Sequence, residues 1–359
     1  MQLPFSGLRR NKSVVGLDIG SSAVKVVELH AKPKGFDLVH LGVAPLPPEA
    51  IVQGAFLNSA AIVEAIRSAV SRGGIKAQNA VVAVSGHSVI VKKISLPAMT
   101  REELEESIRW EAEQYIPFDV NEVNLDFQIL SQASTEGQMD VLLVAAKKDL
   151  IDDYTSVVTE AGLKPAVIDV AAFAVENAFE ANYDASPDDV VALVNLGAQT
   201  ANINILSGGV PCFTRDISAG GNQYTEEIQK ALSIGFEEAE RIKLGGSGAE
   251  DSQEVVPQEV EQAIRVVNEA VIAEITRSLD FFAATSADMR VNRVVLAGGG
   301  SMVPGLDTMF HEKTNVRVER MNPLARMVES DRHDPAMLHQ LAPVLGVGVG
   351  LALRRIDER

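Results

Sequence analysis

The chain has 359 residues, a length that suggests two or three domains, and its 46% hydrophobic content is ordinary for a globular protein. Its 32 Lys and Arg against 49 Asp and Glu leave a net charge of −17. A field of this sign repels nucleic-acid phosphates and anionic lipid, and so argues against binding to either. The one cysteine, Cys212, excludes an intramolecular disulfide, indicates a reducing compartment, and is expected to be a small core residue.

The sequence shows no targeting segment. Two arginines precede the first strand pattern, but there is no apolar stretch of the kind found in a secretory signal. The apolar run Leu341–Leu353 is rich in glycine and too short for a bilayer, which needs about 17–25 residues. We therefore expect a cytoplasmic protein for which any role at a membrane comes through a partner.

The first part of the chain alternates in the manner of strands before a helical period appears. Strands are expected at Ser13–Leu17, Val24–Leu29 and Phe36–Val43, a helix at Asn58–Ser71, and a further strand at Asn79–Val84.

The next stretch has a different order of elements. A strand is expected at Val89–Leu96, a helix at Thr100–Ile116 that opens with a capping box, strands at Val123–Leu130 and Met139–Ala146, and a helix at Asp149–Ala161. This βαββα order predicts a small module inserted into the first unit.

Longer α/β segments follow. Strands are expected at Val190–Asn195, Thr200–Leu206, near Cys212 and at Val294–Ala297; helices are expected at Asn222–Leu232, Phe236–Leu244, Gln258 to about Ala287, and Pro343–Leu353.

The two halves of the chain resemble each other at one place. VGLDIGSSAVKVVEL (Val15–Leu29) and ALVNLGAQTANINIL (Ala192–Leu206) align without gaps at an offset of 177, about half the chain. Both patterns read as strand, polar turn and strand. This predicts a duplication, with chance similarity between two hairpins as the alternative.

The polar turn of the first hairpin could hold an anion. Backbone N–H groups of a turn rich in Gly and Ser converge on one point, a carboxylate can hold Mg²⁺ through water, and a lysine can reach a phosphate. The turn supplies Asp18, Gly20, Ser21, Ser22 and Lys25. The alternative is an ordinary β-hairpin with a polar turn.

Two further polar or glycine-rich loops extend this pattern. The second hairpin carries Asn195, Gly197, Gln199 and Thr200, and two opposed hairpins can clamp a polyphosphate. The run Gly298, Gly299, Gly300 and Ser301 follows a buried strand, where the glycines allow a close backbone approach. A tight strand-to-helix crossing and a dinucleotide fold with Glu319 as ribose acid are the alternatives.

Three motifs in this order carry a family resemblance: VVGLDIGSSAVK, VNLGAQT and VVLAGGGSMVPGL. They resemble the phosphate-1, phosphate-2 and adenosine motifs of the actin/chaperone/sugar-kinase superfamily. The insert and the segment AERIKLGG are similar to FtsA, and WEAEQYIPF resembles the PilM family of type IV pilus assembly proteins. The resemblance covers nearly the whole chain.

The resemblance implies an α/β, actin-like (ribonuclease H-like) duplicated two-lobed fold with an inserted FtsA-type βαββα module. The expected divisions are a first lobe at 12–85 with a return segment at about 164–185, a partner-binding module at 86–163, and a second lobe at 186–359 with a helical subdomain at about 222–290.

The resemblance also implies ATP with Mg²⁺ between the lobes. By motif, the residues of both hairpin turns would face phosphates, with Asp18 near the metal. Ribose, adenine or phosphate contacts would come from Gly220, Gly221, Glu240, Lys243 and the run Gly298 to Ser301. The phosphate-2 motif departs from that of active ATPases, because Asn195 and Asn202 stand where carboxylates are usual. We expect slow or absent hydrolysis, since metal ligands and a means of orienting water are lost.

In the PilM family the implied partner is PilN, an inner-membrane protein whose N-terminal cytoplasmic peptide binds at a groove bounded by the insert. Trp110, Ile116 and Phe118 are the expected contact residues. Trp110 lies off the apolar stripe of its helix, and packing against the neighbouring domain is the alternative to a partner anchor. An FtsA-like division or filament protein and a small-molecule kinase are the competing functions; the chain ends LALRRIDER, without the amphipathic membrane helix of FtsA.

Overall fold

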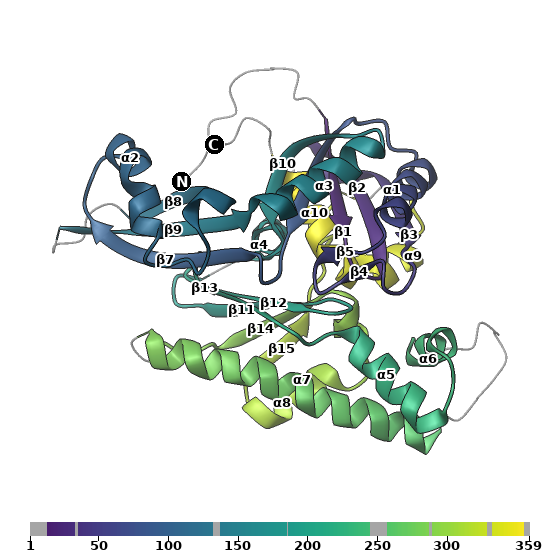
Figure 1. Cartoon of the computed structure of the whole chain (residues 1–359). Helices are drawn as coiled ribbons and strands as arrows, with labels where there is room; N and C mark the ends of the chain where they lie inside the picture. Colours follow the sequence, from purple (N-terminus) through teal and green to yellow (C-terminus); the bar gives the residue numbers. More distant parts are fainter. Residues whose placement is uncertain are drawn as a thin grey trace.

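The computed structural model describes residues 13–32, 35–131, 137–184, 186–244, 257–286, 289–328 and 332–354. The last two residues of AERIKLGG lie outside these ranges, as do residue 12 at the start of the expected first lobe and residues 355–359 at the end of the expected second lobe. The described chain forms two lobes, each built on a five-stranded sheet, with a third, smaller sheet beside them (Figure 1).

The two large sheets have the same topology. The first has the order β3–β2–β1–β6–β10 and the second β13–β12–β11–β14–β15, each with three antiparallel strands followed by two parallel ones. The strands of the first sheet are β1 (Val14–Ile19), β2 (Ala23–Lys32), β3 (Gly35–Pro45), β6 (Asn79–Val84) and β10 (Lys164–Val170). Those of the second are β11 (Val190–Leu196), β12 (Ala201–Ser207), β13 (Val210–Ile217), β14 (Arg293–Ala297) and β15 (Arg317–Arg320).

The hairpin register supports the predicted duplication residue by residue. Asp18 pairs with Lys25 across β1 and β2, and Asn195 pairs with Asn202 across β11 and β12. These pairs are related by the offset of 177 found in the sequence. Chance similarity between two hairpins would not reproduce the order and direction of all five strands, so we interpret the two lobes as a duplication.

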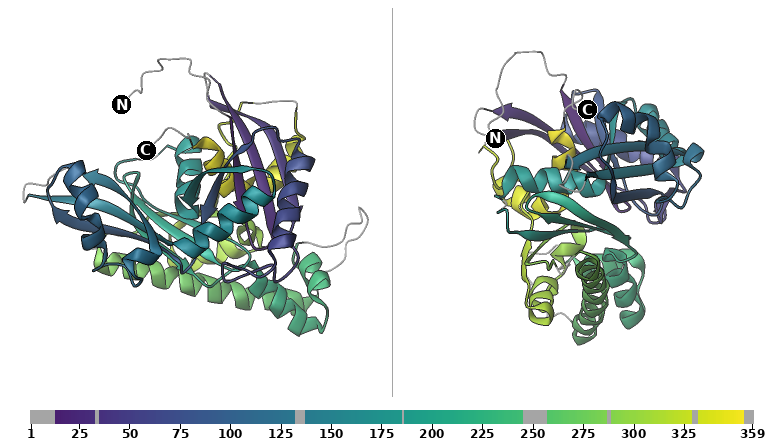
Figure 2. Two further views of the ribbon diagram at one scale, coloured as in Figure 1. Left: turned by 45° about the horizontal axis from the view of Figure 1, so that its top comes forward. Right: turned by 90° about the vertical axis from the view of Figure 1, so that its left-hand side faces the viewer.

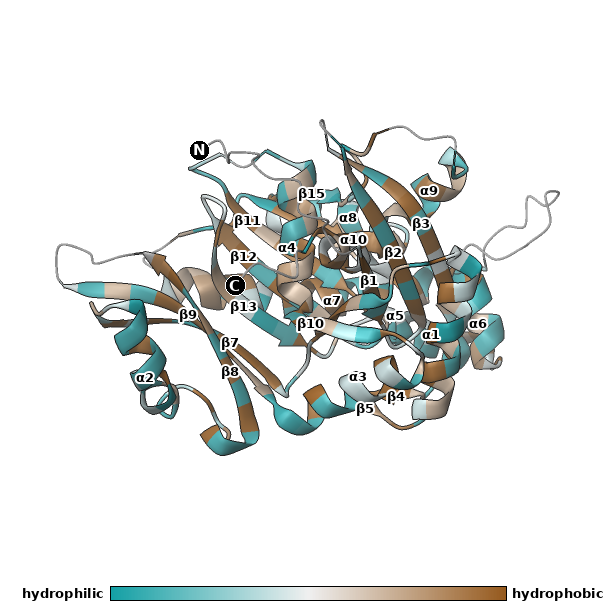
Figure 3. Ribbon diagram, turned by 90° about the horizontal axis from the view of Figure 1, so that it is seen from above, coloured by the Kyte–Doolittle hydropathy of each residue, from teal (hydrophilic) through white to brown (hydrophobic). Residues whose placement is uncertain are grey.

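Helices lie on both sides of each sheet (Figures 1 and 2). The first sheet packs against α1 (Ser59–Gly73) and α3 (Lys148–Glu160) in one core. A second core, between the sheets, contains α4 (Ala171–Asn182) and α10 (Gly346–Leu353). The second sheet packs on its other face against α5 (Gly221–Leu232), α7 (Gln258–Thr285) and α8 (Leu306–Thr314). In Figure 3 the strands of both sheets are largely hydrophobic, as this layered burial requires.

The glycine-rich helix α10 approaches its neighbours closely. A Cβ atom on Gly350 would lie 1.6 Å from the carbonyl oxygen of Ala174 in α4, and one on Gly16 of β1 would lie 2.2 Å from the carbonyl oxygen of Gly348. Side chains at these positions would prevent the approach. The expected helix from residue 343 begins at Gly346, after a 3₁₀ turn, η3 (Ala342–Leu345).

One helical segment of the described residues, Pro335–Leu353, is long and apolar enough to cross a membrane. It joins α9 (Pro335–Leu341), η3 and α10, and is longer than the apolar run considered from the sequence. About half of this segment is buried inside the fold, and Gly346 to Ala352 are all buried. Packing between the two sheets therefore accounts for its hydropathy.

The insert has a core of its own. Its sheet has the order β7–β9–β8, formed by β7 (Val89–Pro97), β8 (Val123–Ser131) and β9 (Gln138–Lys147), and α2 (Arg101–Ala112) packs on one face. The predicted capping box of Thr100 and Glu103 is confirmed. The helix ends at Ala112 rather than Ile116. The N–H groups of Tyr115 and Ile116 still donate to the carbonyl of Ala112 in a closing turn, and Pro117, which has no N–H, cannot continue the ladder.

The last helix of the expected βαββα order packs elsewhere. Leu150, Tyr154, Val157 and Val158 of α3 are buried in the first-lobe core with α1, not in the core of the insert. As a packed unit the insert therefore consists of β7, α2, β8 and β9.

Short elements that the sequence patterns did not predict complete the described fold. They include the hairpin β4 (Ile51–Val52) and β5 (Ala55–Phe56), η1 (Val120–Glu122) and η2 (Gly299–Met302). The helix α6 (Phe236–Lys243) was expected from the sequence. Cys212 is half-buried on β13 and packs against the second-lobe core, in agreement with the small core residue expected. Burial raises the pKa of its thiol to about 11.

Candidate functional site

The first hairpin brings its predicted polar residues together. Lys25 Nζ lies 2.9 Å from Asp18 Oδ2, and both side chains are about 15% exposed (14% and 15%). Gly20 N–H donates to the carbonyl of Ala23, which closes the turn around Ser21 and Ser22. A Cβ atom on Gly20 would lie 3.5 Å from Lys25 Nζ and 4.0 Å from Asp18 Oδ1, so glycine keeps the space beside this ion pair open.

The second hairpin repeats the backbone but not the charges. Gly197 N–H donates to the carbonyl of Thr200, as Gly20 does to Ala23. In place of the ion pair, Asn195 Nδ2 donates to Asn202 Oδ1 at 3.1 Å. The two turns therefore offer the same shape, one with a lysine and a carboxylate and the other with two amides.

The start of α5 is held against the second turn. The N–H groups of Gly221 and Asn222 donate to the carbonyls of Gly197 and Ala198, at 2.9 and 2.8 Å. A Cβ atom on Gly220 would lie 2.5 Å from the carbonyl oxygen of Ala198. These two N–H groups are thus hydrogen-bonded to the turn. Position 220 must be glycine because a side chain there would clash with the backbone of Ala198.

Glu240 and Lys243 of α6 join this cluster from the next helix. The buried ammonium of Lys243 lies 2.6 Å from Glu240 Oε2 and donates to Thr225 Oγ1 and the carbonyl of Gly221, at 3.0 and 3.1 Å. Thr225 was not predicted from the sequence. The arrangement fixes α6 on the first turn of α5 beside the turn of the second hairpin.

The glycine run after β14 packs closely on β11. A Cβ atom on Gly298, which has φ +82°, would lie 2.4 Å from the carbonyl oxygen of Leu196 and 2.7 Å from Asn195 Oδ1. One on Gly300 would lie 2.5 Å from Leu196 Cγ. Ser301 is fully buried and donates to the carbonyl of Gly298. Internal packing therefore requires glycine at 298 and 300, while a Cβ on Gly299 would meet only Val344 Cγ1, at 3.7 Å.

The dinucleotide alternative is wrong. The sheet that contains β14 includes three antiparallel strands, unlike the parallel sheet of a dinucleotide fold. Glu319 is paired with Arg293 of the neighbouring strand β14 and with Arg317 of its own strand β15, rather than being available to a ribose.

Two side chains of the second lobe hydrogen-bond to the first lobe beside the hairpins. Gln199 Nε2 donates to the carbonyl of Ile51 at 2.7 Å, and its Oε1 accepts from Gln53 N–H at 3.0 Å. Asp216 Oδ2 accepts from Gly86 N–H at 2.5 Å. The sequence patterns placed Gln199 toward phosphates and did not identify Asp216. The only feature of the sequence that marks Asp216 is an acidic residue near the end of a strand, which by itself does not indicate a contact with the first lobe.

The residues of both turns fit a hydrated divalent cation and a polyphosphate. Asp18 and Asn195 supply oxygens, Lys25 supplies a positive charge, and the glycines at 20 and 197 keep side chains out of the turns. Among the described residues, no group of three or more His, Cys, Asp or Glu is placed to hold a metal by itself. A bound cation would thus take much of its shell from water and phosphate.

The three predicted partner residues differ in accessibility. Trp110 on α2 is 75% exposed, so the alternative of packing against a neighbouring domain is not what the structure shows. Ile116 is buried in the core of the insert, and Phe118 is half-buried under Lys147, whose Nζ lies 4.7 Å from the ring centre.

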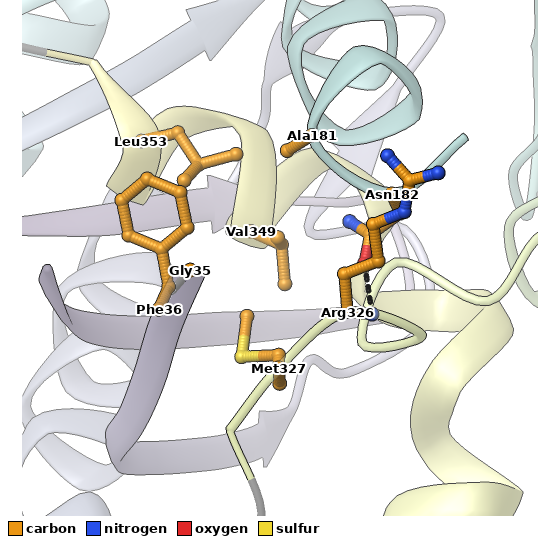
Figure 4. Close-up of a pocket in the computed structure, with 8 residues that line it drawn as sticks. All are labelled: Gly35, Phe36, Ala181, Asn182, Arg326, Met327, Val349 and Leu353. Atoms are coloured by element: carbon orange, nitrogen blue, oxygen red, sulfur yellow. Dashed lines mark hydrogen bonds between the residues drawn. The ribbon is translucent and has the colours of Figure 1, made fainter. Parts of the chain in front are cut away.

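A cavity of about 250 Å³ lies away from all of these residues (Figure 4). Phe36 of β3, Val349 and Leu353 of α10, and Met327 give it an apolar wall, and Asn182 of α4 accepts a hydrogen bond from the backbone N–H of Arg326 at its rim. None of the residues predicted for nucleotide or partner binding lines it.

Comparison with known proteins places the chain in a family. Residues 16–356 match the family model described as type IV pilus assembly protein PilM. The chain belongs to the PilM family. A solved PilM from a structure titled "PilM-PilN type IV pilus biogenesis complex" is 31% identical, covers 98% of this chain and 100% of its own, and superposes with a TM-score of 0.85.

More distant relatives place this PilM-family protein within the actin-like fold. The cell division protein FtsA of Bacillus subtilis is 23% identical, over 88% of this chain and 80% of its own length. MreB5 of Spiroplasma citri, solved bound to AMPPNP, is 12% identical over 95% of each chain with a TM-score of 0.52. The predicted actin-like, two-lobed α/β fold and the resemblance to PilM and FtsA are confirmed.

Proposed function

We propose that this PilM-family protein is an ATP-binding cytoplasmic scaffold of type IV pilus assembly, held at the inner membrane by the N-terminal cytoplasmic peptide of PilN. The observation that carries the proposal is the full-length likeness, at 31% identity, to a PilM solved as a complex with PilN. Below 25% identity, the likeness to FtsA and MreB5 supports the fold but not a division or filament function.

Nucleotide binding rests on the two hairpins. Asp18 and Lys25 form a charged pair at an open glycine turn, and the second turn faces the same kind of ligand with amides. A structural relative, MreB5, carries AMPPNP. Because the chain has a net charge of −17, ATP would be held by local N–H groups, Lys25 and Mg²⁺ against an opposing overall field.

Hydrolysis is expected to be slow or absent. Asn195 and Asn202 bond to each other, and neither side chain can act as a carboxylate base. ATP cleavage in a single turnover at the rate of an actin-like chaperone would contradict this part of the proposal.

Partner binding is assigned to the exposed part of the insert around Trp110. A tryptophan that is 75% exposed on a capped, well-packed helix presents a rigid aromatic surface, which is favoured at binding hot spots. Ile116 contributes through the core that supports this helix, since its own side chain is buried. The overall negative charge favours a basic segment of the partner.

The test is calorimetric titration of the protein with a synthetic peptide of the PilN cytoplasmic N-terminus, with and without ATP and Mg²⁺. Trp110→Ala should weaken peptide binding by about tenfold or more, as expected for a hot-spot residue. Leu57→Ala is the matched control, because Leu57 is a similarly exposed apolar residue (66%) on the first lobe.

The outcomes separate the two parts of the proposal. No binding of the peptide by the unaltered protein would refute the assigned function. Equal affinities of the Trp110→Ala and unaltered proteins would refute only the role of Trp110 and direct the search to other faces of the insert.

A further inference from the structure

Asp216 occupies a position between two hydrogen-bond donors. Its Oδ1 accepts from Asn202 Nδ2 at 2.8 Å, and its Oδ2 accepts from Gly86 N–H at 2.5 Å. A carboxylate can accept both bonds because it carries only acceptors. An amide of the same shape has one acceptor and one donor, and would set a donor against one of these two partners.

The carboxylate also fixes the orientation of two amides in series. Asn202 must turn its NH₂ group to Asp216, which leaves Asn202 Oδ1 to accept from Asn195 Nδ2 at 3.1 Å. Asn195 must then turn its own oxygen away from Asn202. That oxygen lies next to Gly298, where a Cβ atom would come within 2.7 Å of it.

We propose that Asp216 is a positioning residue of the nucleotide site, which acts through Asn202 to make Asn195 present its amide oxygen, rather than its NH₂ group, beside the Gly298 loop. The inference rests on the proposed nucleotide binding. An oxygen is the kind of ligand that Mg²⁺ and its bound water accept, whereas an NH₂ group is not. Asp216 thereby compensates in part for the carboxylate that the phosphate-2 motif lacks at Asn195.

The same carboxylate connects this arrangement to the first lobe. Gly86 lies between β6 and β7, in the segment that leads from the first sheet into the insert. The bond from Gly86 to Asp216 therefore ties the orientation of the two amides to the relative position of the lobes. Tyr183, at the end of α4, accepts a hydrogen bond from Asn322 N–H at 2.7 Å; it takes no part in the chain of hydrogen bonds from Asp216 to Asn195 and serves as a control.

The test uses three variants that differ in the number and place of the carboxylates at these two positions: D216N has none, N202D has two, and the double exchange D216N/N202D has one. D216N removes the acceptor for one donor. N202D sets two carboxylates next to each other. The double exchange restores the series, because the carboxylate introduced by N202D accepts from Asn195 Nδ2 and from the amide introduced by D216N, whose oxygen accepts from Gly86.

Two measurements are made on each variant: the melting temperature without nucleotide, and the affinity for ATP with Mg²⁺ and with EDTA. Each single variant should lower the melting temperature by about 2–4 °C. Each should also weaken binding of ATP with Mg²⁺ by about tenfold, as expected for the loss of a hydrogen bond to a charged group. Binding in EDTA should change much less. The double exchange should recover most of both losses.

Y183F is expected to leave the ratio of affinities with Mg²⁺ and with EDTA unchanged, since it removes the hydrogen bond to Asn322 without altering the amides. The proposal is overturned if D216N matches the unaltered protein in both measurements, or if the double exchange is no better than the single variants. Failure of the unaltered protein to bind ATP would refute the proposed nucleotide binding and with it the role assigned to Asp216. In that case the melting temperatures alone would report whether the hydrogen-bonded series exists.

Discussion

The two lobes share their backbone register but differ in the chemistry placed on it. At the paired positions of the hairpin, the first lobe has the ion pair Asp18 and Lys25, and the second has Asn195 and Asn202. On the third strand of each sheet the charge is found only in the second lobe. Lys25 is paired there with the neutral Val43, whereas Asn202 is paired with Asp216. The two lobes thus share the shape of the turn, but the carboxylate lies on the hairpin itself in the first lobe and on the neighbouring strand β13 in the second.

The faces toward the central helices differ in the same way. Gly16 and Val27 are paired on the first sheet, and the equivalent pair on the second sheet is Leu193 and Asn204. α10 lies directly on Gly16 and Val27, whereas Asn204 contacts Glu176 of α4. Each sheet is therefore fitted to a different connecting helix, and substitutions that make one lobe resemble the other should be costly.

The largest effect is expected for Gly16→Ala. The added Cβ would lie 2.2 Å from the carbonyl oxygen of Gly348 and 2.6 Å from the nitrogen of Ala352, both backbone atoms that cannot move aside singly. We expect the free energy of unfolding to fall by about 3 kcal/mol, at the upper end of the usual cost of overpacking. Urea unfolding measures it. Gly299→Ala, whose Cβ would be 3.7 Å from Val344 Cγ1, should cost far less; equal losses would show that α10 adjusts its position freely.

A smaller, pH-dependent effect is expected at Glu176. Burial raises the pKa of Glu176 to about 8 from 4.5, and the nearby carboxyls of Glu180 and Asp169 act in the same direction, while the bond from Asn204 Nδ2 at 2.7 Å opposes them. Because the folded-state pKa lies above the unfolded value, the contribution of Glu176 to stability is fully present below about pH 4.5 and is lost as the pH rises through about 8.

Glu176→Gln removes this titration while keeping an oxygen that can accept from Asn204. The variant should be more stable than the unaltered protein at pH 9, by on the order of 3 kcal/mol, and nearly equal to it near pH 5. Urea unfolding across this range checks the sign. Glu64→Gln, on the exposed face of α1, is the matched control. A difference that grows toward acid would contradict the assignment of the raised pKa to Glu176.

Repetition in the sequence was enough to predict the hairpins, their pairing and the duplication, because period-two alternation and turn residues are local signals. Local signals also predicted the capping box at Thr100. They could not predict that α3 leaves the insert for the first-lobe core, since its apolar stripe suits either partner. Nor could they predict the contacts of Gln199 with Ile51 or of Asp216 with Gly86, which join residues 130 or more positions apart. The candidate site was thus predictable as a set of turns, but not as two lobes bonded to each other.

The smallest expected effect distinguishes the two hairpins by their response to salt. Lys25→Met leaves Asp18 without its partner, and Asn195→Ala removes the donor to Asn202; each should lower the free energy of unfolding by about 1 kcal/mol. Screening acts on charges, and the Debye length falls to about 3 Å at 1 M salt. Because the side chains of Asp18 and Lys25 are only about 15% exposed, screening reaches this pair in part, and the loss caused by Lys25→Met should shrink modestly between low and high NaCl, measured relative to the unaltered protein, while that of Asn195→Ala stays constant. If both losses respond alike to salt, the charged and the neutral hairpin are energetically equivalent, and the difference between the lobes must be sought in what each turn binds rather than in how each is held.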